Sequence, residues 1–272
     1  MLTRKLLSIF IKPTILISLL IPTFFISGSA HAAEATPAQS ELATYLSKFG
    51  AQDQQAMSNL INQHRLAKLI EKPVASKRLT FGSEKSPLHL IEWIDIQCPH
   101  CKNLSFALEE LREMAPQNSW NIESRHYPLD KECNANAFPS KKPGVSCLAA
   151  QVLICLSGHP SFDDVKLELF RQQAFLSIEG IWNTATTDAE ERKALKACVN
   201  SPETAEQLKT DIEYAQAHGI RGTPLVVING RNAPAVPPVI YALILAKGDS
   251  NDAAFATLPV PKEMKHDHDH EH

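Results

Sequence analysis

The spacing of hydrophobic positions changes its period several times along this chain, and each change marks an expected element. An apolar run over residues 88–96, bounded by Pro87 and a turn at Cys98, predicts a buried strand. Residues 99–115 then place their leucines on one face and their acidic side chains on the other, as an amphipathic helix does. Further strands are predicted over residues 79–81, 121–127 and 225–228, and one more after an Asn229-Gly230 hairpin turn. Further helices are predicted from Ser146 to Leu156, from Ser161 onward, near the capping pair Thr187 and Glu190, from Ser201-Pro202 to Gly219, and over residues 236–246.

This order of elements predicts a mixed α/β domain over residues 76–247, interrupted by a helical insert over 129–219. Before the domain, residues 33–75 are polar but carry two apolar stripes, and they predict two helices interrupted near Gly50. Such stripes are expected to pack against the same domain or to form a dimer interface, and partial disorder of the segment is the remaining alternative. After the domain, residues 248–272 predict a flexible, histidine-rich tail. The two stripes comprise Leu42, Leu46, Phe49, Met57, Leu60, Ile61 and Leu69.

Residues 1–32 have the features of an export signal. Arg4 and Lys5 form a basic start, an uncharged stretch of 18 residues runs from Pro13 to Ala30, and small residues surround a cleavage point after Ala32. The alternative is an uncleaved membrane anchor, which needs about 20 predominantly apolar residues. The stretch here is shorter and contains prolines and serines, so we expect cleavage and export to the periplasm.

Composition narrows the class of protein. The 272 residues are 44% hydrophobic with a net charge of −3, which argues against a disordered chain and against a polycationic nucleic-acid binder, so no nucleic-acid partner is expected. Only 10 residues are glycine, which favours a helix-rich domain. Six cysteines in an exported chain direct attention to thiol chemistry, because disulfides persist outside the cytosol.

The strongest local signal is Cys98-Pro99-His100-Cys101, at the junction of the buried strand and the following helix. A zinc site would need a second closely spaced ligand pair, and c-type haem attachment would need histidine where Lys102 stands. A structural disulfide would be unusual at a helix start. We therefore predict a redox dithiol without bound metal or cofactor.

The position of each residue in this motif predicts its role. Cys98 lies at a helix N-terminus with Pro99 at the first helical position, where unpaired amides favour a thiolate, so Cys98 is the expected nucleophile. Cys101 continues along the apolar face and is the expected buried resolving thiol. The helix terminus alone is too weak for a strongly lowered thiol pKa, so His100 is expected to contribute a further donor.

With Thr223-Pro224 just before a late strand, this motif resembles the DsbA-like branch of the thioredoxin superfamily, over roughly residues 78–247. The resemblance implies an α/β, thioredoxin-like fold with an inserted helical domain and an N-terminal helical extension. It also implies that the Thr223-Pro224 bond is cis and holds substrate beside Cys98; the residues alone would predict only a turn. Glu92, by the same resemblance, lies beneath the dithiol and relays protons, although a plain edge-strand glutamate is the alternative. Asp95 has the opposite parity and is expected to point away.

The other four cysteines are expected to form structural disulfides, although some could be free buried thiols. Cys147 and Cys155 are separated by about 12 Å of helical rise, beyond the ~7 Å limit for bridged Cα atoms. That leaves Cys133–Cys147 with Cys155–Cys198, or Cys133–Cys155 with Cys147–Cys198. The first pairing is favoured by a resemblance of Pro128-Leu129-Asp130, Cys133-Asn134 and Cys147-Leu148-Ala149-Ala150 to thioredoxin-like domains that accompany bacterial vitamin K epoxide reductase homologues.

Together these features predict a periplasmic thiol–disulfide oxidoreductase that introduces disulfides into exported, cysteine-containing proteins. No membrane half follows the domain, so a separate membrane redox partner is expected to re-oxidise it. Two alternatives stay open. One is a dimeric disulfide isomerase or reductase, suggested by Thr223 and the N-terminal extension. The other is a thiol or metal chaperone that uses the dithiol and the alternating histidines and carboxylates of residues 266–272, although a solvated tail is the simpler interpretation.

Overall fold

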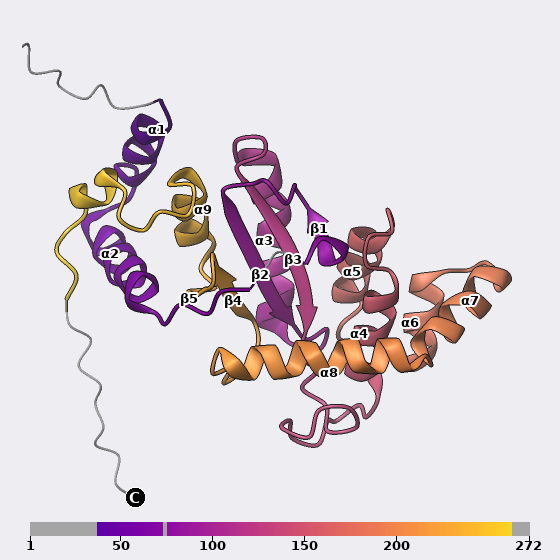
Figure 1. Cartoon of the computed structure of the whole chain (residues 1–272). Helices are drawn as coiled ribbons and strands as arrows, with labels where there is room; N and C mark the ends of the chain where they lie inside the picture. Colours follow the sequence, from indigo (N-terminus) through magenta and orange to yellow (C-terminus); the bar gives the residue numbers. More distant parts are fainter. Residues whose placement is uncertain (1–36, 73–74, 263–272) are drawn as a thin grey trace, which may run out of the picture. The chain divides into compact units, whose positions relative to one another are not determined.

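A computed structural model describes residues 37–72 and 75–262 (Figure 1), so the predicted export signal and the histidine-rich end lie outside the described residues. The strands are β1 (Leu79–Phe81), β2 (Leu88–Ile94), β3 (Trp120–His126), β4 (Leu225–Ile228) and β5 (Arg231–Ala233). The helices are α1 (Pro37–Leu46), α2 (Ala51–Leu66), α3 (Pro99–Met114), α4 (Val145–Cys155), α5 (Phe162–Arg171), α6 (Ile178–Ala185), α7 (Ala189–Val199), α8 (Pro202–Ala217) and α9 (Pro237–Leu245), with 3-10 turns η1 (Ser76–Arg78) and η2 (Ala253–Thr257).

The strands form one sheet in the order β1-β3-β2-β4-β5, so β2 is its central strand. β2 runs parallel to β3, from the pair Leu88 and Trp120 to the pair Ile94 and His126, and antiparallel to β4. A central strand is covered on both faces, which accounts for the almost unbroken apolar run. The prediction that this strand extends to residue 96 is wrong by two residues, because the chain turns after Ile94.

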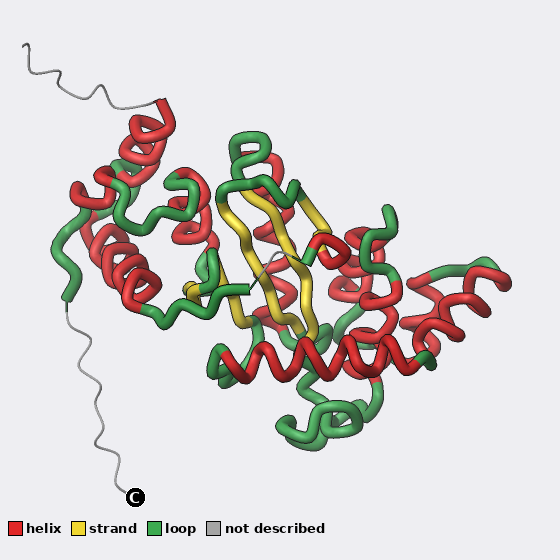
Figure 2. The backbone as a smooth tube through the Cα atoms, viewed as in Figure 1, coloured by secondary structure: helices red, strands yellow, loops and turns green. Residues whose placement is uncertain are grey.

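Helices cover both faces of the sheet (Figure 2). Leu88 and Leu90 of β2 share one buried cluster with α3 and α9, whereas Ile91 and Trp93 share another with α8. The alternation of β2 side chains between the two faces produces this division. Figure 1 shows the helices of the insert, α4 to α7, on the β1 side of the sheet.

The insert has a hydrophobic core of its own, to which Ile94, Ile96, Cys98 and Cys101 also belong. The insert begins with an irregular loop over residues 129–144, and its first helix, α4, follows that loop. Two predicted caps are displaced. Gly144, in the left-handed region at φ 79°, precedes α4 instead of Ser146, and the side chain of Asp188, not Thr187, caps α7.

The N-terminal helices pack on the same chain. Leu42 and Leu46 of α1 and Met57 and Ile61 of α2 are buried in the cluster that includes α9. The stripes that motivated a dimer are therefore largely buried within the chain, whereas Leu69 lies beyond α2 and is exposed. Dimerisation stays a prediction, but the apolar stripes that motivated it are largely covered by the same chain and no longer support it.

The prediction of a flexible tail from residue 248 is wrong for residues 248–262. Phe255 and Leu258 are buried in the cluster with α1, and Arg65 donates hydrogen bonds to the carbonyl of Ser250 at 3.0 and 2.7 Å. The hydroxyl of Ser58 donates to the carbonyl of Pro259 at 2.6 Å. These contacts fix the segment against α1 and α2, so it is part of the folded domain.

Candidate active site

The two cysteines of the motif lie where β2 gives way to α3. Cys98 is the N-cap residue of α3 and Pro99 follows in its first turn, as predicted. Both cysteines are free thiols; Cys98 is 6% exposed and Cys101 is fully buried. The dithiol lies where two hydrophobic clusters meet. Cys98 and Cys101 belong to the cluster of the insert, whereas the buried leucines of α3 belong to the cluster that packs on the sheet.

The two thiols have opposite electrostatic surroundings. The pKa of Cys98 is lowered to about 5, chiefly by a hydrogen bond from the Cys101 thiol, with further help from the Thr223 side chain and the amides of Cys101 and His100; burial acts in the opposite direction. Burial raises the pKa of Cys101, which stays protonated. These surroundings favour a thiolate on Cys98 and a proton on Cys101, whereas the nucleophilic and resolving roles stay predictions.

His100 acts differently from the expectation. Its side chain is exposed at the start of α3, and its backbone N–H, not its imidazole, is the group that lowers the pKa of Cys98. The hydrogen bond expected from the His100 side chain therefore comes from a backbone N–H at the helix terminus. The chief contribution comes from the Cys101 thiol, for which only a resolving role was expected.

Thr223 and Pro224 lie against the dithiol, although they are more than a hundred residues away in the chain. The peptide bond between them is cis, as predicted from the resemblance. The Cys98 thiol donates to the Thr223 carbonyl at 3.2 Å, and the otherwise unpaired Thr223 hydroxyl helps to lower the pKa of Cys98. The segment before β4 therefore forms one wall of the site.

Glu92 is fully buried in the central strand, so the alternative of an edge-strand glutamate is wrong. Its Oε1 accepts hydrogen bonds from the Ser124 hydroxyl at 2.7 Å and from the Lys166 ammonium at 3.1 Å. Lys166 belongs to α5 and is itself only 1% exposed. No role was predicted for Lys166, although it shares the helical spacing of the apolar residues Phe162, Val165, Leu169 and Phe170, which indicates a buried position.

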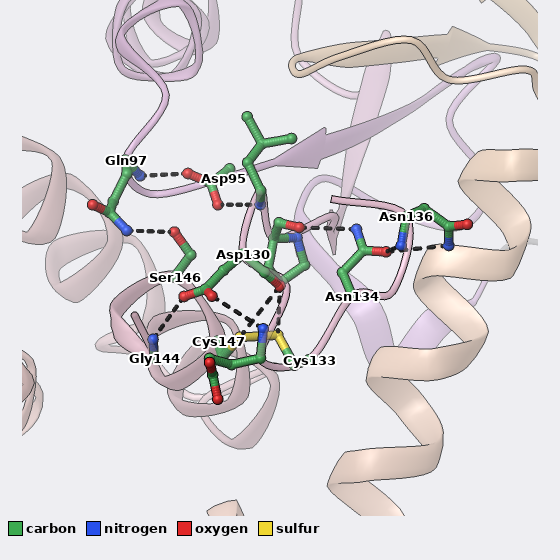
Figure 3. The surroundings of a disulfide bond; sticks show 12 residues. Asp95, Gln97, Asp130, Cys133, Asn134, Asn136, Gly144, Ser146 and Cys147 are labelled. Carbon is green, nitrogen blue, oxygen red and sulfur yellow. Dashed lines mark hydrogen bonds between the residues drawn. A yellow bond between two sulfur atoms is a disulfide. The ribbon is translucent and has the colours of Figure 1, made fainter. Parts of the chain in front are cut away.

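Asp95 does not point away from the dithiol, as expected from its parity, but is buried close enough to Cys98 for the two charges to interact. Its carboxylate accepts hydrogen bonds from the backbone N–H of Gln97 at 2.7 Å and of Leu129 at 2.8 Å (Figure 3). The Gln97 side chain in turn donates to the Ser146 hydroxyl at 2.8 Å. The turn that leads into Cys98 is thus held by the insert and by the loop that precedes it.

Two structural disulfides cross-link the insert beside the dithiol. Cys133 is bonded to Cys147, with Cα atoms 5.8 Å apart, and Cys155 to Cys198, with Cα atoms 6.0 Å apart. This is the pairing that the resemblance favoured. The first bridge closes the loop before α4, in which Asp130 accepts a hydrogen bond from the Gly144 amide at 2.8 Å (Figure 3).

We expect the reactivity of Cys98 toward an alkylating reagent to rise with pH around a midpoint near pH 5, because only the thiolate reacts. The same lowered pKa should stabilise the folded, reduced protein above the pKa of a free cysteine and lose that effect as the pH falls toward 5. Mass spectrometry of protein labelled between pH 4 and pH 8 measures the midpoint and the site. Faster labelling of Cys101 would contradict the assignment.

Comparison with known proteins agrees with this arrangement. A family model described as Thioredoxin matches residues 74–238, more than half of the chain. The solved structure of BdbD from Bacillus subtilis is similar with a TM-score of 0.53 and 20% identity, covering 66% of this chain and 97% of that one. DsbA2 from Pseudomonas aeruginosa gives a TM-score of 0.46 and 23% identity, covering 60% and 87% of the two chains.

One curated relative is a much longer protein. A protein named Na(+)/H(+) antiporter NhaA 1, from Mycolicibacterium gilvum (strain PYR-GCK), is 26% identical over 153 residues, which are 55% of this chain and 23% of that protein. The chain therefore spans less than a quarter of that relative. In the ranges 37–72 and 75–262, no helix combines the length and hydropathy needed to cross a bilayer. The family match, together with the sheet order and the dithiol at the start of α3, shows that the chain belongs to the thioredoxin family.

Proposed function

We propose that this chain is a thiol–disulfide oxidoreductase that donates the disulfide between Cys98 and Cys101 to cysteine pairs of exported proteins. The observation that carries the proposal is the pairing of a stabilised Cys98 thiolate with a buried, protonated Cys101 at the start of α3. Such asymmetry is what disulfide exchange requires, because one sulfur must react with substrate and leave while the other stays protected.

The exchange proceeds in two balanced steps. A substrate thiolate attacks the Cys98 sulfur, the bond to Cys101 breaks, and Cys101 takes up a proton. A second substrate thiolate then attacks the substrate sulfur of the mixed disulfide and releases Cys98 as a thiolate. The substrate pair is thereby oxidised and the cysteine pair of this chain reduced by two electrons.

The lowered pKa of Cys98 favours donation of the disulfide over its formation. A thiol whose pKa is about 5 instead of 9 gains about 2.7 kcal/mol at pH 7 from ionisation. For a two-electron couple this raises the reduction potential by ~60 mV, because 30 mV corresponds to about 1.4 kcal/mol. The reduced form is stabilised, so the disulfide is a stronger oxidant.

We expect equilibration with glutathione to give a reduction potential closer to the ~−120 mV of a strong oxidant than to the ~−270 mV of a reductase. Oxidised and reduced protein are quantified by alkylation and mass spectrometry across a series of glutathione ratios. A value near the lower figure would contradict donation and favour the reductase alternative. Absence of any redox equilibrium at Cys98 would contradict the proposal as a whole.

The compartment and the partners belong to the same proposal. The basic start and uncharged stretch of residues 1–32 support export to the periplasm, where a disulfide donor meets newly exported chains. The reduced pair must be re-oxidised to work again, and we propose a separate membrane protein for that step. Among the described residues, which do not include the histidines of residues 266–272, no group of three or more histidine, cysteine or acidic side chains could hold a metal ion.

A further inference from the structure

Asp95 carries a buried negative charge beside the dithiol without a cationic partner. Its carboxylate accepts hydrogen bonds from the amides of Gln97 and Leu129 and from the Ser146 hydroxyl, all of them neutral donors. No lysine, arginine or histidine forms an ion pair with it in the part of the chain that the structure describes. Glu92, in contrast, is paired with the Lys166 ammonium. Of these two buried carboxylates on and just after β2, Asp95 is therefore the one whose charge is not neutralised.

The backbone of Asp95 is in direct contact with both cysteines. Its N–H lies 3.5 Å from the Cys101 sulfur, and its carbonyl accepts the N–H of Cys98 at 3.1 Å. Burial raises the pKa of the Asp95 carboxyl, and the charge of Cys98 raises it further, against the three hydrogen bonds that lower it. A thiolate on Cys98 and a carboxylate on Asp95 consequently disfavour each other.

A small cavity lies beside Asp95. Its volume is about 10 Å³, room for about one water molecule, and its polar lining comes from Asp95, His126 and Ser146. Nε2 of His126 is buried and has no hydrogen-bond partner among the described residues. Burial keeps the pKa of His126 well below its usual range, so this imidazole is neutral. It can exchange a hydrogen bond with a water or a protonated carboxyl in the cavity without adding charge.

The other ionisable groups near Asp95 do not replace the dithiol as the partner to which its carboxyl is electrostatically coupled. Asp130, in the neighbouring loop, is tied to the amides of Glu132 and Gly144. Glu92 is paired with Lys166 at 3.1 Å, and neither of them is among the groups that shift the pKa of Asp95. The charges of Arg78, Lys166 and Arg125 help burial to lower the pKa of His126, which keeps that imidazole neutral. The charge that responds to the redox state beside Asp95 is thus that of the Cys98 thiolate.

We propose that Asp95 is a redox-linked proton site, which takes up a proton when the Cys98–Cys101 disulfide is reduced and releases it when the disulfide re-forms. The inference rests on the proposed function, because it needs the cysteine pair to cycle. Reduction by two glutathione thiols breaks the disulfide and releases two protons and one glutathione disulfide. One proton binds to Cys101 and the second binds to Asp95, while Cys98 remains a thiolate and no proton is left over.

This proton balance has a measurable consequence. If Asp95 takes up no proton, reduction at a pH above the pKa of Cys98 releases one proton into solution. The equilibrium constant for reduction by glutathione should then rise tenfold for each pH unit. With Asp95 taking that proton, the constant should stay level over an interval above pH 5 and rise only at higher pH. In Asp95→Asn we expect the rise to begin at lower pH, and the constant at pH 7 to exceed that of the native chain by about tenfold.

Asp130→Asn is the matched control. Asp130 is equally buried and also accepts two backbone amides, so this substitution should cost similar stability but leave the pH at which the rise begins unchanged. An infrared difference spectrum between the reduced and oxidised protein should show a protonated carboxylic acid band that Asp95→Asn removes. The same pH profile in Asp95→Asn as in the native chain, or loss of the level interval in Glu92→Gln instead, would overturn the inference. Failure of the native chain to equilibrate with glutathione would overturn the proposed function instead.

Discussion

Replacing Cys98 with serine should reduce the rate of disulfide exchange by at least about 10³-fold, the order of loss that follows removal of a catalytic nucleophile. Replacing Cys101 with serine should have a different outcome. Cys98 keeps a hydroxyl donor in place of the Cys101 thiol, so it remains a reactive thiolate, but the buried sulfur that resolves a mixed disulfide is gone. We therefore expect the Cys101→Ser protein to accumulate as a one-to-one adduct with a disulfide-bonded peptide.

Non-reducing electrophoresis and intact mass measurement distinguish these outcomes. The matched control is the double variant Cys155→Ser with Cys198→Ser, which removes a disulfide of the insert and should lower the free energy of unfolding by about 2–4 kcal/mol. It should leave peptide oxidation intact, because neither residue contacts the dithiol. A stable adduct on Cys98→Ser, or none on Cys101→Ser, would reverse the roles assigned to the two sulfurs.

Much of the fold and the dithiol could be predicted because the relevant signals are local. The apolar run of β2, the proline after Cys98 and the leucine spacing of α3 each follow from a few neighbouring residues. Pro224 is different, since its position beside Cys98 depends on contacts across the whole chain and was expected only through the family resemblance.

What could not be predicted depends on packing between distant segments. Residues 249–262 show little periodicity, and nothing in them reveals that Phe255 and Leu258 will be covered by the N-terminal helices. Likewise, alternation along β2 predicted the wrong direction for Asp95, because the chain turns after Ile94. Leu129 and Ser146, which cover Asp95, come from the loop and helix that follow β3. Periodicity predicts on which face of an element a side chain lies, whereas the burial of that side chain depends on the residues that another element packs against the face.

Lys166→Met should lower the free energy of unfolding by about 3–5 kcal/mol, the cost of leaving one member of a buried ion pair without its partner. Lys166 is 1% exposed and Glu92 fully buried, so water cannot replace the missing ammonium. Urea unfolding at pH 7 measures this loss.

The double variant Lys166→Met with Glu92→Gln tests whether charge is the cause. Glutamine keeps an oxygen that can accept from the Ser124 hydroxyl, so the neutral pair should recover most of the lost stability. Lys209→Met, which breaks an exposed ion pair with Glu213 on α8, should change stability by less than about 0.5 kcal/mol. If the double variant were no more stable than Lys166→Met, the cost would lie in packing between α5 and the sheet, and the ion pair would not be what holds the insert to the central strand.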